Sequence, residues 1–198
     1  MIGAGLWGCQ QWNLSKQPVP VLYIAEINED GGVSFVPLHR SQAPGRDFEG
    51  VVIVTHGWVE FTQWPQNMAA SIRKQVDYPR WVVGWLDWRI FARKINPRDA
   101  AEYGRKTAGP MLGDLITKQF SGAKHLHLIG HSAGSWVISE AAAKAAQEMD
   151  CSVHLTFLDA YVPGNREADL LGKTAREQAD AYWAEQYLTY DLTMKVTE

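Results

Sequence analysis

A serine between two glycines is the feature of this sequence with the most chemical content. Residues 130–134 read Gly-His-Ser-Ala-Gly, after the strand-like run 125–129 and before the helix-like run 136–148. In that context the G-x-S-x-G pattern predicts a nucleophile elbow, a sharp strand-to-helix turn that holds Ser132 in a strained conformation above a sheet. Glycine is expected on both sides because a Cβ there would meet the neighbouring strand or the following turn. The alternative is a serine that only caps the helix.

A serine nucleophile needs hydrogen-bond donors for the oxyanion that forms when its oxygen attacks a carbonyl carbon. His56, Gly57 and Trp58 follow the apolar run 51–55, and ligands of open α/β sheets bind beyond the carboxyl ends of the strands. We therefore expect the backbone N–H groups of Trp58 and Ala133 to form an oxyanion hole. The alternative for this loop is a plain turn that uses the backbone freedom of glycine.

Asp159 is the candidate for the acid that orients a catalytic histidine. It ends the apolar run 153–158 and follows Ser132 in chain order, as an acid at such a strand end should. Aspartate also commonly starts loops, which is the alternative. Asp87 ends a strand-like run as well but precedes the serine, so we interpret the segment 87–89 (Asp-Trp-Arg) as packing and salt bridging near the site.

Four short segments together resemble the pancreatic-lipase-like group of α/β-hydrolases, where such motifs occur in the same order. They are VTHGW at 54–58, LDWR at 86–89, LIGHSAG at 128–134 and LDA at 158–160. The resemblance implies hydrolysis of a small-molecule ester without a metal or organic cofactor. By position it implies Ser132 as nucleophile, Asp159 as acid, and the Trp58 and Ala133 amides as oxyanion donors. It also suggests a secreted protein, although residues 1–7 lack the basic start and apolar length of a signal peptide.

The sequence departs from this family at the catalytic base, which the family places well after the acid. All six histidines (39, 56, 125, 127, 131 and 154) precede Asp159. Without a base, serine chemistry loses most of its rate. One explanation is a shortened hydrolase in which residues 194–198 begin the strand before the missing histidine loop. The others are that His56 substitutes as the base, or that the domain binds ligands without catalysing a reaction.

Metal-dependent hydrolysis is a further alternative, because His125 and His127 alternate along one strand and His131 is close in sequence. Leu126 and Leu128 indicate instead that this segment is a strand in the core of a sheet. We therefore expect no metal site and no cofactor.

Strands and helices that could position these residues alternate along the chain. The runs 19–27 and 33–38 flank a glycine-containing turn and predict a β-hairpin. Strands are then predicted at 51–55, 81–87, 125–129 and 153–158, with helices at 66–76, 97–120, 136–148 and 173–188. We expect Gly109-Pro110 to kink or divide the second helix, and residues 190–198 to start a strand.

This order predicts one α/β domain over residues 1–198 with the α/β-hydrolase fold, shortened at its C-terminal end. Its sheet should be mostly parallel, with an N-terminal antiparallel hairpin and helices on both faces.

The composition fits an ordinary globular protein: 198 residues, 46% apolar and 21% charged. A net charge of −3 provides no basic surface for nucleic acid, and no apolar run is long enough to span a membrane. Cys9 and Cys151 could be two thiols or one bridge, and the oligomeric state stays open. Because only a short loop follows Asp159, with no insertion long enough for a lid, we expect short-chain esters as substrates.

Overall fold

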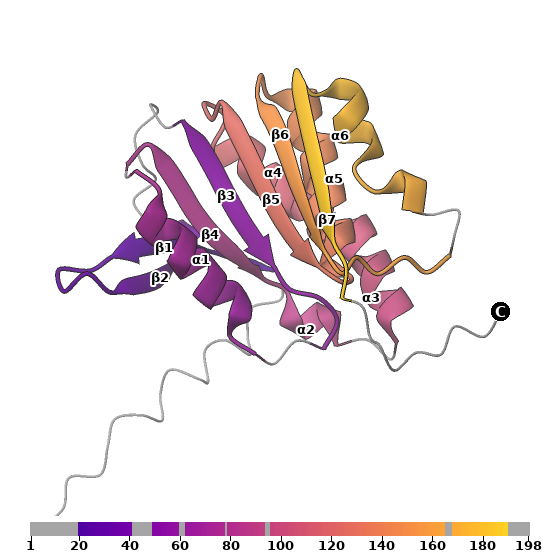
Figure 1. Cartoon of the computed structure of the whole chain (residues 1–198), viewed down its shortest axis with the longest axis horizontal. Coiled ribbons are helices and arrows are strands. Elements are labelled where there is room, and N and C mark those ends of the chain that lie inside the picture. The colour runs from indigo at the N-terminus through magenta and orange to yellow at the C-terminus, as the bar shows by residue number, and fades with distance from the viewer. Residues whose placement is uncertain are drawn as a thin grey trace, which may run out of the picture.

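A seven-stranded sheet forms the centre of the computed structural model, which describes residues 20–40, 49–59, 62–77, 79–93, 96–164 and 168–189. The strand order is β2-β1-β4-β3-β5-β6-β7 (Figure 1). From β4 to β7 neighbouring strands are parallel, whereas β1 pairs antiparallel with both β4 and β2. The strands are β1 (Val21–Ile27), β2 (Val33–Pro37), β3 (Gly50–Thr55), β4 (Trp81–Asp87), β5 (His125–His131), β6 (Ser152–Leu158) and β7 (Ala181–Tyr187).

Helices cover both sides of this sheet, with α1 on one side and α4 and α5 on the other (Figure 1). Each side has its own apolar core, because successive side chains of a strand point to opposite faces. The α-helices are α1 (Trp64–Gln75), α2 (Arg89–Ala92), α3 (Pro97–Tyr103), α4 (Gly109–Gln119), α5 (Gly134–Glu148) and α6 (Lys173–Gln178). Short 3₁₀ turns span Leu38–Arg40 and Ala168–Leu170.

The predicted hairpin is confirmed as β1 and β2, and the next three predicted strands are confirmed as β3, β4 and β5. All six residues of β3 are buried, as expected for a strand in the middle of a parallel sheet. The break in the helix over 97–120 is also confirmed. A π-helical turn over Gly104–Ala108 separates α3 from α4, directly before Gly109-Pro110. Asn96 caps α3 by accepting a hydrogen bond from the Asp99 N–H, at 2.9 Å.

The prediction of one helix over residues 173–188 is wrong. The helix α6 ends at Gln178, and Ala181–Tyr187 is the strand β7, which pairs in parallel with β6. Pairing with the exposed edge of β6 therefore outweighs the helix propensity of Ala184 and Glu185. The strand predicted at 190–198 lies outside the described residues, as does Cys9. Cys151 is buried and forms no disulfide with another described residue. Within the described ranges, no helix has the length and apolar character needed to cross a membrane.

Candidate active site

Ser132 occupies the turn between β5 and α5 in a left-handed backbone conformation, with φ of 50°. Only a few per cent of residues other than glycine have a positive φ, so the chain holds this serine in a strained conformation. Both flanking glycines are required by packing. A Cβ on Gly130 would lie 2.7 Å from the carbonyl oxygen of Gly134, and a Cβ on Gly134 would overlap the carbonyl oxygen of His56. The strand, turn and helix that the motif predicts are therefore present.

The loop after β3 packs directly on this turn. Thr55 is in register with Gly130, so the two strands end side by side. A Cβ on Gly57 would lie 2.8 Å from the Ser132 Cβ and 2.9 Å from the His131 carbonyl oxygen. Only glycine therefore allows this approach between the loop and the serine. The next residue, Trp58, is 38% exposed, whereas Ala133 on the other side of the serine is fully buried.

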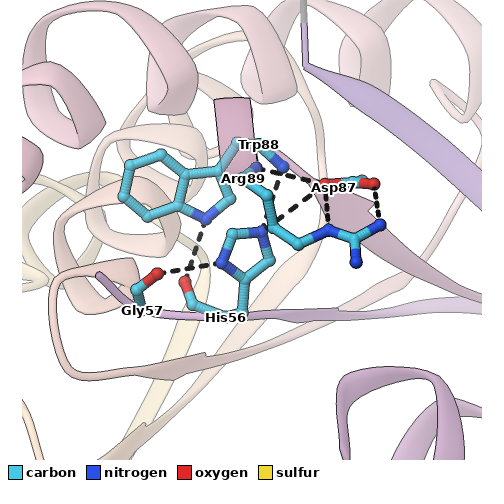
Figure 2. A network of polar contacts seen from close by, with 5 residues as sticks. All are labelled: His56, Gly57, Asp87, Trp88 and Arg89. Carbon is cyan, nitrogen blue, oxygen red and sulfur yellow. Dashed lines mark hydrogen bonds and ion pairs between the residues drawn. The ribbon is translucent and has the colours of Figure 1, made fainter. Parts of the chain in front are cut away.

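His56 is held by backbone groups on both sides of its ring (Figure 2). Its Nδ1 lies 2.9 Å from the Gly57 carbonyl oxygen, and its Nε2 accepts a hydrogen bond from the Trp88 N–H at 3.1 Å. This pair of contacts selects the neutral tautomer with the proton on Nδ1. The Trp88 indole stacks on the ring, with centroids 5.3 Å apart, and its Nε1 donates to the His56 carbonyl oxygen at 2.9 Å.

The predicted salt bridge of the segment 87–89 is confirmed. Arg89 donates two hydrogen bonds to the Asp87 carboxylate, at 3.0 and 2.6 Å. Burial opposes ionisation of Asp87, but the hydrogen bonds and positive charge of Arg89 outweigh it and hold the pKa of the carboxyl well below its usual range. The same segment supplies Trp88, whose side chain is 1% exposed. It therefore fixes the position of His56 and with it the loop that leads to Trp58.

Asp159 lies at the end of the strand next to the serine. His131 is in register with Leu158, and the Ser132 N–H donates to the Leu158 carbonyl oxygen at 2.9 Å. Asp159 also has a positive φ, of 50°, and its side chain is exposed. The structure therefore brings Ser132, Asp159 and the His56–Trp58 loop to the same edge of the sheet.

Two partners of Asp159 come from β7 and from the residues just after it. The Asp159 N–H donates to the Tyr187 carbonyl oxygen at 2.7 Å, and the Thr189 hydroxyl donates to the carboxylate at 2.6 Å. Sequence reasoning missed this contact because it assigned the segment around Tyr187 to a helix. The strand propensity of the aromatic residues at 182, 183 and 187 was the available signal for a strand.

The other histidines lie away from this group or face different partners. His131 packs edge-on against Trp64 of α1, with ring centroids 5.7 Å apart. His125 stacks on Trp81, and its Nδ1 lies 2.6 Å from the Ser152 hydroxyl. His127 instead stacks on His154 of β6. The three histidines that the sequence suggested as a possible zinc site therefore contact three different partners.

A cavity of about 260 Å³ opens beside the first turn of α5. Basic side chains and the Trp136 indole dominate its lining, which consists of Arg98, Ala101, Glu102, Arg105, Lys106, Trp136 and Pro163. Arg105 lies over the Trp136 ring at 5.5 Å, and the Trp136 Nε1 donates to the Tyr161 carbonyl oxygen at 2.9 Å. The cavity is therefore bounded by α3, by the π-helical turn, by α5 and by the loop after Asp159.

Comparisons with known proteins find similarity only among solved structures. No protein-family model and no curated protein matches the sequence. The Francisella virulence factor BioJ has 15% sequence identity and a TM-score of 0.36, over 80% of this chain and 52% of BioJ. A candidate carboxylesterase from Lactobacillus plantarum has 10% identity and a TM-score of 0.38, over 83% of this chain and 76% of that one. TT1662 from Thermus thermophilus has 14% identity and a TM-score of 0.37, over 83% of this chain and 89% of that one.

The chain thus spans about half the length of BioJ. The strand order of its own sheet, the antiparallel hairpin at one edge and the strained serine between β5 and α5 define an α/β-hydrolase type of fold.

Proposed function

We propose that this protein is a serine carboxylester hydrolase with Ser132 as its nucleophile. The observation that carries the proposal is the positive φ of Ser132 at the strand-to-helix turn, where packing excludes a side chain from both flanking positions. Such strain persists only where the surrounding structure enforces it, and it is concentrated at functional sites. The Ser132 oxygen attacks the ester carbonyl carbon, the alcohol leaves, and water then releases the acid from the acyl-enzyme.

The Trp58 and Ala133 amides are the proposed oxyanion donors. Gly57 lies against Ser132, and Ala133 is the next residue in the turn, which supports a place for both residues beside the serine. The network of His56, Trp88 and Asp87 supports this role because it fixes the loop before substrate binds. Pre-positioned donors of this kind stabilise the transition state without reorganisation.

Asp159 is the proposed acid, and His56 is not the imidazole that it orients in this proposal. His56 has both ring nitrogens engaged by backbone groups and is fully buried, which favours a positioning role over that of the base. This chain by itself should therefore show slow turnover, at the rate that substrate binding and the oxyanion donors alone can support. In serine proteases that remainder is about 10³–10⁴ over the uncatalysed reaction.

Hydrolysis of p-nitrophenyl butyrate with and without free imidazole tests the proposal. A small base that enters the site takes over the proton transfer of the absent side chain. We expect imidazole to raise the rate of the wild-type protein and to leave that of Ser132→Ala at the background with imidazole alone. Equal rates for the two proteins at every imidazole concentration would contradict a nucleophilic Ser132.

Chain length is the second variable of this assay. The loop after Asp159 is short, so we propose short-chain, soluble esters as substrates. A higher kcat/KM for butyrate than for a laurate ester is expected. Preference for emulsified long-chain triglyceride would contradict it.

Ligand binding without turnover is the second candidate function. The engagement of both His56 nitrogens by backbone groups favours it, because the loop beside Ser132 then lacks a free base. A serine-directed phosphonate separates the two candidates. Covalent labelling of Ser132 supports the hydrolase, and its absence in the presence of imidazole supports the binding module.

A further inference from the structure

At one end of the sheet, three strands carry polar side chains on the same face as α1. The helix α1 covers this face only in another part of the sheet. The helix α1 packs against β1, β3 and β4. On β7 the same face is open, with Trp183 66% exposed and Tyr187 57% exposed (Figure 1 shows β7 at the edge of the sheet). Inside this open region the strands β5, β6 and β7 present His127, His154 and Glu185.

The register of the sheet brings these three side chains together. His127 is directly opposite His154, and the two rings stack with centroids 3.8 Å apart. Glu185 is opposite Thr156, two residues further along β6. One nitrogen from each ring and one carboxylate oxygen all lie within 4.8 Å of one another. Each strand thus contributes one potential ligand atom.

We propose that His127, His154 and Glu185 form a binding site for a divalent transition metal ion, with zinc as the probe. Two imidazoles and a carboxylate are a donor set that zinc commonly takes, with water completing the tetrahedron. The proposal shares no residue with the Ser132 site, and it uses only His127 from the three histidines that sequence spacing suggested.

The contact between His154 and Glu185 has the separation that the proposal requires. His154 Nε2 lies 3.3 Å from Glu185 Oε1 and, although buried, makes no hydrogen bond. Two ligand atoms of a tetrahedral zinc ion lie about 3.3 Å apart, given bond lengths of about 2.0–2.1 Å. One ring nitrogen of His127 lies within 4.8 Å of the ligand atoms of the other two residues, so a movement of about 1.5 Å brings it to the same spacing from either of them.

A hydrogen-bonded chain holds these groups together without the ion. His127 Nε2 lies 2.8 Å from the Thr156 hydroxyl, which donates to Glu185 Oε1 at 2.8 Å. Because the Thr156 hydroxyl donates its proton to Glu185, His127 Nε2 carries the proton of its contact with Thr156. Metal binding would place this proton of His127 on Nδ1 and free the Nε2 lone pair, and the Thr156–Glu185 hydrogen bond would remain.

Zinc binding to the full chain, after removal of metal with a chelator, tests the site. We expect one tight site per chain in a calorimetric titration at pH 7. Substitution of a ligand, by His154→Ala or by the isosteric Glu185→Gln, should weaken binding by at least about tenfold. Because the ion would connect three strands, saturating zinc should raise the wild-type melting temperature by about 5 °C or more.

Two further variants distinguish coordination from general effects. His125→Ala removes a histidine from the same face of β5 that is outside the group, and Thr156→Val breaks the hydrogen-bonded chain but keeps all three ligands. Both should bind zinc within about threefold of wild type. Equal affinity of wild type, His154→Ala and Glu185→Gln would overturn the proposal, as would loss of binding in His125→Ala with Glu185→Gln unaffected. Circular dichroism of each variant excludes unfolding as the cause.

Discussion

Replacing Ser132 by glycine and by alanine measures the backbone strain at the proposed nucleophile, because both variants lack the hydroxyl. With φ of 50°, a residue with a Cβ is less stable here by about 1–2 kcal/mol than in the right-handed region, whereas glycine is not. Glycine makes the unfolded chain more flexible than alanine does, which costs about 0.5–1 kcal/mol. The difference leaves Ser132→Gly more stable than Ser132→Ala by up to about 1.5 kcal/mol, with a midpoint of about 0.75 kcal/mol.

Ser135 provides the matched comparison in the first turn of α5, where it is fully buried. It has no positive φ, so Ser135→Gly should be less stable than Ser135→Ala by about 1 kcal/mol. Equilibrium unfolding in urea, followed by tryptophan fluorescence, gives the free energy of unfolding of all four variants. The glycine–alanine difference should have opposite signs at the two positions. If alanine is the more stable residue at both, Ser132 is not in the left-handed conformation and the elbow reasoning is refuted.

Three other substitutions test the support of the site. Gly57→Ala places a Cβ 2.8 Å from the Ser132 Cβ, so it should lower the free energy of unfolding by about 1–3 kcal/mol and slow labelling of Ser132. Trp88→Phe leaves the buried His56 carbonyl oxygen without its donor and should cost about 1–3 kcal/mol in the same urea assay. Asp87→Asn should make the free energy of unfolding depend less on pH at acidic pH. Wild type loses stability as the pH falls below the ordinary carboxyl pKa of 3.8, because the unfolded chain then takes up a proton while the folded carboxylate stays ionised.

Each of these predictions has a control or a contrary result. Gly164 has open space where a Cβ would be added, so Gly164→Ala should change stability by less than about 0.5 kcal/mol. An equal effect at positions 57 and 164 would contradict close packing of the loop on the serine. Trp183 is 66% exposed, and Trp183→Phe should be neutral where Trp88→Phe is not. If the free energy of unfolding falls equally with decreasing pH in wild type and in Asp87→Asn, this result would contradict a lowered pKa at that carboxyl.

The elbow could be predicted from sequence because its signals are local. The glycines at 130 and 134, the apolar strand before them and the helix after them all lie within 25 residues of chain, and the structure has the same elements. The end of β6 at Asp159 could be predicted for the same reason. Its place beside Ser132 then follows from the parallel pairing of β5 and β6.

The segment around Glu185 could not be assigned in this way. Its alanines and glutamates favour a helix locally, and only pairing with β6 makes it a strand. The group of His127, His154 and Glu185 could not be predicted from the sequence for a related reason. It depends on the register of three strands, and register is set by tertiary pairing rather than by spacing along the chain.

Mass spectrometry after treatment with a fluorophosphonate tests the central claim most directly. The reagent forms a stable bond with an activated serine oxygen and so reports the nucleophile independently of the physiological substrate. We predict a single adduct on the peptide that contains Ser132, faster in the presence of imidazole and absent from Ser132→Gly. An adduct on another serine, or no adduct on the folded wild-type protein with imidazole present, would contradict the account.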